Sequence, residues 1–93
     1  MLFRSANETA DIAKLDAIKT AATAAVALEG ISIDTLEVTE TTVVANKGED
    51  SETDILADAD FLTYYGATSY DPNLKCETAN WDGSKWILIQ PSN

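Results

Sequence analysis

The chain lacks histidine altogether and contains a single cysteine, Cys76, among its 93 residues. Without histidine there is no imidazole to act as a general base, to activate a serine or cysteine nucleophile, or to bind a metal ion. One cysteine cannot form an internal disulfide or a cysteine-rich zinc site. These absences exclude the commonest sets of catalytic groups, and the sequence predicts no catalytic residue.

Basic residues are also scarce, with 6 Lys and Arg against 16 Asp and Glu and a net charge of -10. A surface this negative repels phosphate groups, so we expect no direct nucleic-acid contact and no binding to an anionic membrane through a basic face. The longest run of small and apolar residues, 21–28, is far shorter than the ~20 residues of a transmembrane helix. We therefore also expect no membrane span, and the first residues do not resemble a secretory signal.

Glycine is scarce too, and its 4 scattered residues form no phosphate-binding loop. Carboxylates are so numerous that chance pairs are certain, so they do not indicate glycosidase chemistry. Asp54, Asp58 and Asp60 lack the residue order and the glycine of a calcium-binding EF-hand loop. We expect a protein that is not an enzyme, with no cofactor-binding site and no metal site.

The first third of the chain has the period of one long helix. Gly30 is a natural residue to follow the helix, because glycine readily adopts a positive φ. We predict a helix from about Asn7 to Leu28 within residues 1–30. Apolar residues recur at helical spacings of three and four at Ile12, Leu15, Ile18, Ala22, Ala25 and Val26.

Residues 31–93 form a β-rich acidic unit of the same single domain, 1–93. Alternating or β-branched segments predict strands within 31–45, and Phe61–Tyr65 also has strand-like composition. Asp82-Gly83, between two tryptophans, predicts a closing hairpin. The predicted fold class is α+β, with one long N-terminal helix packed on a small, mostly antiparallel β-sheet of four to five strands.

The second half of the predicted helix has a thin apolar face of small side chains. Such a face can approach another backbone closely. It packs either on the chain's own sheet or on the same helix of a neighbouring subunit, where oligomerisation would stabilise a small core. The residues of this candidate interaction face are Ala21, Ala22, Ala25 and Val26.

The aromatic residues offer a second candidate surface. Either one tryptophan of the hairpin fills the space between the sheet and the alanine-rich part of the helix, or aromatic side chains form an exposed binding patch. The candidate interaction residues are Tyr64, Tyr65 and Trp81.

The stretch from Asp34 to Asp60 carries nine acidic residues and one basic residue, Lys47. Three roles remain open for these acids. In the first, the acids solvate the protein and keep edge strands apart by repulsion. In the second, they bind a basic surface of a partner. In the third, Asp54, Asp58 and Asp60 bind a divalent cation.

The end of the chain resembles a known class of proteins. One helix followed by an acidic β-unit ending in Asn80-Trp81-Asp82-Gly83-Ser84-Lys85-Trp86-Ile87-Leu88-Ile89 is similar to small structural proteins of tailed bacteriophages. Head-completion, head–tail connector and capsid-decoration proteins often end on a hairpin with this DG-x-x-W-x-ϕ pattern, where ϕ is apolar. The resemblance implies a non-enzymatic virion component, a homo-oligomer whose partners are itself and a capsid or connector protein.

The acidic composition leaves a second functional class open. An acidic inhibitor or DNA mimic, located in the host cytoplasm, would bind the basic nucleic-acid-binding cleft of a host protein. Its carboxylates would have to follow one stripe, since duplex DNA carries a charge every ~1.7 Å of its axis.

Overall fold

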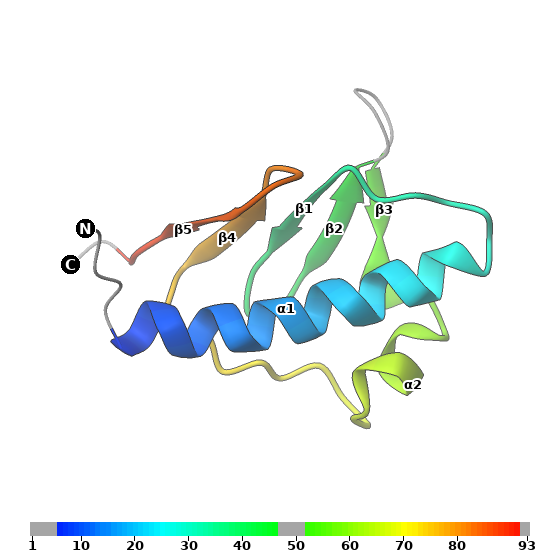
Figure 1. Cartoon of the computed structure of the whole chain (residues 1–93). Helices are drawn as coiled ribbons and strands as arrows, with labels where there is room; N and C mark the ends of the chain where they lie inside the picture. Colours follow the sequence, from blue (N-terminus) through cyan, green and yellow to red (C-terminus); the bar gives the residue numbers. More distant parts are fainter. Residues whose placement is uncertain (1–5, 47–51, 92–93) are drawn as a thin grey trace.

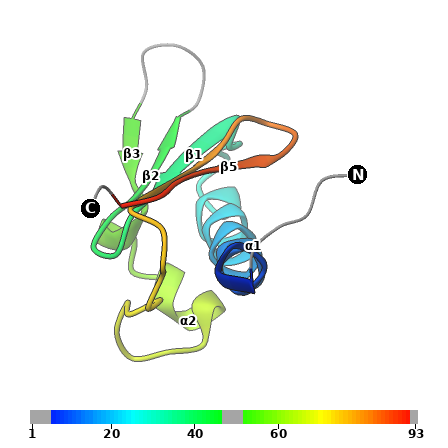
Figure 2. The ribbon, with the colours of Figure 1, turned by 90° about the vertical axis from the view of Figure 1, so that its left-hand side faces the viewer.

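The structure, a computed structural model, describes residues 6–46 and 52–91. The five strands form one antiparallel sheet in the order β3-β2-β1-β4-β5. Helix α1 crosses one face of this sheet (Figures 1 and 2). The predicted α+β class is therefore confirmed. The elements are α1 (Ala6–Ala27), β1 (Thr35–Val38), β2 (Val43–Asn46), β3 (Glu52–Asp54), the 3-10 helix η1 (Ile55–Ala57), α2 (Phe61–Tyr65), β4 (Thr78–Trp81) and β5 (Trp86–Ile89).

Helix α1 ends where the sequence predicts. Gly30 adopts a φ of 76°, and its N–H donates to the carbonyl of Ala27 at 3.1 Å. The N–H of Ile31 donates to the carbonyl of Val26 at 3.0 Å. These two bonds form a Schellman motif, which satisfies carbonyls that the helix leaves without partners.

The core lies between α1 and the inner face of the sheet. Alternate strand residues such as Leu36 and Val38 are buried there, because successive side chains of a strand point to opposite faces. The outer face is different: Glu37 is exposed, and no described helix lies over this face (Figure 2). The sheet therefore has one covered face and one open face.

Phe61–Tyr65, expected to be a strand, is instead the short helix α2. The N–H of Gly66, with a φ of 84°, donates to the carbonyl of Leu62 at 2.8 Å and ends the helix. The rings of Phe61 and Tyr65 stack with centroids 5.3 Å apart, a contact that the four-residue spacing of a helix allows. Packing of α2 on α1 thus overrides the strand preference of the aromatic residues.

The predicted terminal hairpin is present, but its tip lies one residue later than expected. The N–H of Asp82 donates to the carbonyl of Lys85 at 3.1 Å. The Asp82 carboxylate accepts from the N–H groups of Ser84 and Lys85 at 2.8 and 2.9 Å. Gly83, with a φ of 103°, and Ser84 therefore form the tip. The bond from the Lys85 N–H is the main reason why the pKa of Asp82 is lowered.

Candidate functional site

The alanine-rich face of α1 lies inside the molecule. Ala21 is 1% exposed, and Ala22, Ala25 and Val26 are 0% exposed. All four belong to the cluster that α1 forms with the strands of its own sheet. Of the two arrangements that the sequence left open, the structure has the packing on the chain's own sheet. A neighbouring helix could reach these side chains only if the fold opened.

The two tyrosines proposed as interaction residues lie in different environments. Tyr64 on α2 is 49% exposed. Tyr65 is half-buried and lies beside Tyr70, with ring centroids 5.9 Å apart. The Tyr70 hydroxyl donates to the carbonyl of Thr39 at 2.7 Å. The tyrosines therefore do not form a single exposed patch, and Tyr65 helps to hold α2 in place.

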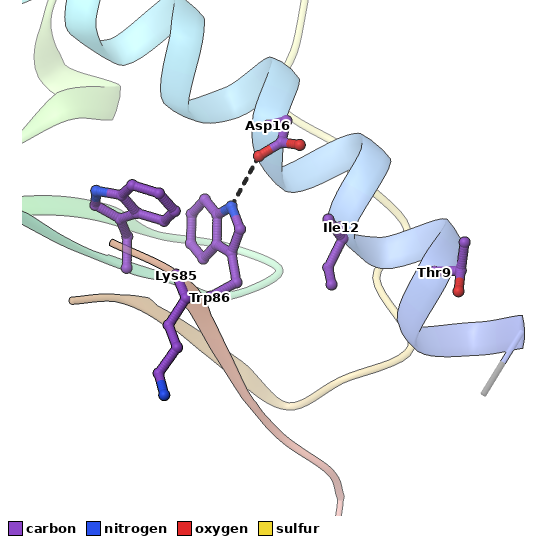
Figure 3. A pocket seen from close by; sticks show the side chains of 6 residues that line it. Thr9, Ile12, Asp16, Lys85 and Trp86 are labelled. Carbon is purple, nitrogen blue, oxygen red and sulfur yellow. Dashed lines mark hydrogen bonds between the residues drawn. The ribbon is translucent and has the colours of Figure 1, made fainter. Parts of the chain in front are cut away.

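The two tryptophans do come together, at a cleft between α1 and the terminal hairpin. Trp81 and Trp86 are paired residues of β4 and β5, and their ring centroids are 5.5 Å apart. The cleft has a volume of about 320 Å³ and is shown in Figure 3. It is lined by Thr9, Ile12, Asp16, Trp81, Lys85 and Trp86.

Trp86 is the buried tryptophan, only 6% exposed, and it belongs to the same buried cluster as the alanines of α1. Its ring N–H donates to the Asp16 carboxylate at 2.9 Å (Figure 3). Helix α1 runs from beneath β5 at its start toward β3 at its end (Figure 1). The indole is therefore bonded to the helix at Asp16, before the alanine-rich part that begins at Ala21.

Trp81 is half-buried, and a lysine covers its ring. The ammonium of Lys19 lies 3.6 Å from the Trp81 ring centroid, a cation–π contact. With the Asp16–Trp86 bond, this contact ties the hairpin to α1 from two sides. Two polar contacts thus connect the walls of the cleft, and the cleft itself is open to solvent.

Strand β5 forms one edge of the sheet, and half of its backbone groups point away from β4. The carbonyls of Lys85 and Ile89 accept from Asp82 and Glu77, on the β4 side. Because backbone groups alternate in direction along an antiparallel strand, the N–H and C=O groups of Trp86 and Leu88 point outward. No other strand of the described chain pairs with them.

The same strand exposes apolar side chains on the open face. Ile87 is 46% exposed and Ile89 is 50% exposed. Strand β5, Trp86–Ile89, contains no charged residue. An exposed, uncharged edge strand is a template for pairing with another chain. The outward edge of β5, its two isoleucines and the adjoining cleft are together called the β5 edge site below.

Asp11 is a structural residue that the sequence analysis did not identify. It is 0% exposed, and its carboxylate accepts from the N–H of Lys75 at 2.9 Å and from the N–H of Cys76 at 2.8 Å. Its position, four residues before Leu15 and seven before Ile18, follows the spacing of the buried residues. This helical spacing was the one sign in the sequence that Asp11 would be buried.

Cys76 lies beside this carboxylate and is 3% exposed. Burial first, and then hydrogen bonding to Asp11, raises the pKa of the Cys76 thiol to about 11. The thiol therefore stays protonated at neutral pH, and only a thiolate is a good nucleophile.

The aspartates proposed for a divalent cation are engaged with nearby backbone. Asp54 accepts from the N–H of Leu56 at 3.1 Å and caps η1. Asp58 accepts from the N–H of Asp60 at 2.8 Å. Among residues 6–46 and 52–91, no group of three or more Asp, Glu, Cys or His is arranged to bind a metal ion.

Comparison with known proteins gives no indication of function. The chain matches no protein-family model, no curated protein and no solved structure. Of the helices in the described part of the chain, none combines the length and apolarity needed to cross a bilayer.

Proposed function

We propose that this chain is a non-enzymatic assembly protein that acts through protein–protein contacts at the β5 edge site. One observation carries the proposal: an edge strand without charge presents two half-exposed isoleucines, Ile87 and Ile89, on the open face of the sheet. Exposed edges of this kind are normally protected by charge, proline or a covering element. Main-chain bonds supply affinity when a partner strand is added, and the side-chain contacts supply specificity.

The proposed setting is a phage virion, with the chain itself and a capsid or connector protein as partners. This setting rests on the resemblance of the terminal hairpin to virion proteins. The residues that carry the resemblance, from Asn80 to Ile89, include all of β5 and the second half of β4. The hairpin on which the resemblance rests thus also contains β5, an edge strand with which no further described strand pairs.

The acidic-inhibitor alternative has less support. Such a protein needs free carboxylates along one stripe. Five of the acids accept hydrogen bonds from other groups of the chain, and they lie in separate parts of it. These are Asp11, Asp16, Asp54, Asp58 and Asp82.

Co-sedimentation with assembled capsids from the encoding phage tests the proposed function. The parent chain is expected to sediment with the particles. Ile89→Lys, which places a charge at the β5 edge, is expected to abolish binding. Val44→Lys is the matched control, because Val44 lies on the same open face but in β2, an inner strand, and it should bind as the parent does.

A second variant separates the two functional classes. Asp54→Asn combined with Asp58→Asn removes two negative charges but leaves β5 unchanged, so capsid binding should persist. Loss of binding in this variant, together with normal binding by Ile89→Lys, would contradict the proposal and favour an electrostatic role.

A further inference from the structure

We propose that β5 pairs antiparallel with β5 of a second copy about a two-fold axis at Leu88, joining the two five-stranded sheets into one continuous sheet. This inference rests on the proposed function, since it names the first partner of the β5 edge site. The pairing is isologous, with the same strand contributed by both copies, as in most two-fold symmetric oligomers.

The two edges of the sheet differ in a way that selects β5. At the other edge, β3 is three residues long, Glu52–Asp54, and both Glu52 and Asp54 are exposed. Pairing β3 with a copy of itself would bring these carboxylates together, and like charges on facing strands are destabilising. β5 has no charge to oppose self-pairing, although the whole chain carries a net charge of -10.

The backbone fixes the register. Trp86 and Leu88 direct their N–H and C=O groups outward, so a partner strand must bond to these residues. With Leu88 opposite Leu88 of the second copy, their backbone groups exchange two hydrogen bonds. Ile87 then lies opposite Ile89 of the second copy in a non-hydrogen-bonded pair, where side chains approach most closely. Four isoleucines would form one apolar strip on the joined open face.

The charges that flank β5 are complementary in this arrangement. Lys85 directly precedes β5, whereas the N–H of Glu77 donates to the carbonyl of Ile89 at 2.8 Å, at the other end of the strand. Antiparallel pairing brings the start of one β5 to the end of the other. Each Lys85 therefore comes toward the end of the partner's β5 beside which Glu77 lies. Glu77 is one strand away from the interface, on the β4 side, and its charge is opposite to that of the approaching lysine.

Sedimentation equilibrium across a wide range of protein concentration tests the pairing. The parent chain is expected to approach twice its monomer mass of 10.0 kDa. The double variant Ile87→Lys with Ile89→Lys places a lysine opposite a lysine at both 87–89 pairs of the interface. Its self-association should therefore be weaker than that of the parent chain by at least ~tenfold. Ile87→Glu with Ile89→Glu should weaken it similarly. Mixing the lysine variant with the glutamate variant should restore a dimer of one chain of each kind.

A fourth protein tests the register. Ile87→Lys with Ile89→Glu in one chain places opposite charges together only if position 87 faces position 89 of the second copy, so this variant should still dimerise. Its failure to dimerise would overturn the Leu88-centred register. Val44→Lys is the control for charge on the open face and should dimerise normally. Circular dichroism melting of every variant checks that each chain is folded.

Two outcomes overturn self-pairing itself. The first is a parent chain that remains at 10.0 kDa at every concentration, and the second is a dimer that survives both double variants of like charge. Co-sedimentation distinguishes this failure from failure of the proposed function. If the parent chain is monomeric but still binds capsids, and the Ile89→Lys variant does not bind them, self-pairing is wrong. The proposed function then still holds, with a partner other than a second copy.

Discussion

A single carboxylate, that of Asp11, joins the start of α1 to the segment that leads into β4. Its two partners, the N–H groups of Lys75 and Cys76, lie 64 and 65 residues away in sequence. Burying a charge is costly unless hydrogen bonds replace its hydration, and here both carboxylate oxygens accept them. Lys14, one turn further along α1, donates to the carbonyl of Asn73 at 2.8 Å and holds the same segment.

Asp11→Ala should lower the free energy of unfolding by about 3 kcal/mol, because it leaves the buried N–H of Cys76 and the part-buried N–H of Lys75 without an acceptor. Urea denaturation monitored by tryptophan fluorescence measures the loss. Asp11→Asn keeps one acceptor oxygen and should lose less. A change below about 1 kcal/mol for Asp11→Ala would mean that water replaces the carboxylate.

The raised pKa of Cys76 predicts a pH dependence. The folded chain holds the thiol proton up to about pH 11, whereas the unfolded chain releases it near pH 9.0. The native state therefore binds more protons in this range, and stability falls as the pH rises from about 9 to about 11. Urea midpoints measured across this range should fall less steeply for Cys76→Ala. Equal slopes in the two proteins would contradict the assignment.

At the scale of elements, the end of α1 depends on one backbone conformation. No atom lies within 4 Å of the position that a Cβ would take at Gly30. A side chain there would cause no clash, so the cost of replacing this glycine comes from its φ of 76° alone.

Gly30→Ala should destabilise the fold by about 1–2 kcal/mol, the usual cost of the left-handed conformation for a residue with a Cβ. Gly30→Asn should cost less, since asparagine tolerates this conformation better. Thermal melting of the three proteins checks the order. Alanine as stable as glycine would show that the turn after α1 can change its conformation freely.

Elements set by local pattern could be predicted, and elements set by distant packing could not. The helix period and Gly30 located α1, and Asp82-Gly83 located the hairpin. Phe61–Tyr65 has strand-forming residues, yet it becomes α2 because its rings pack on one another and on α1. The β5 edge site was missed for a similar reason, because a sequence does not show which strand lies at the edge of a sheet.

For the whole molecule, the excess of negative charge opposes folding wherever acids meet. Glu29, in the turn after α1, hydrogen-bonds to Asp58, and this contact followed by charge repulsion raises the pKa of Glu29. A raised carboxyl pKa means that the folded state holds the proton more tightly. This contribution is present at acid pH and is lost as the pH rises through the pKa of the folded state.

Glu29→Gln should therefore raise the melting temperature near pH 7. The gain should shrink as the pH falls toward 4.5, the ordinary pKa of this carboxyl, because both the folded and the unfolded chain are protonated below it. Added salt should also shrink the difference, because it screens exposed charges. Glu77→Gln removes the same charge from another exposed position and serves as the control. An equal gain in both variants would indicate a general charge effect without a specific role for the Asp58 contact.

The long-range bonds of α1 also bear on how the chain folds as it is made. Asp11, Lys14 and Asp16 have partners 59 to 70 residues later in the sequence. Helix α1 is made before the strands, and the part of it that contacts the β4 and β5 segment stays uncovered until that segment has been synthesised. Distant contacts slow folding, and uncovered apolar surface promotes aggregation. A ribosome stalled before Trp86 would therefore hold a chain that cannot complete its core, because Trp86 belongs to the buried cluster.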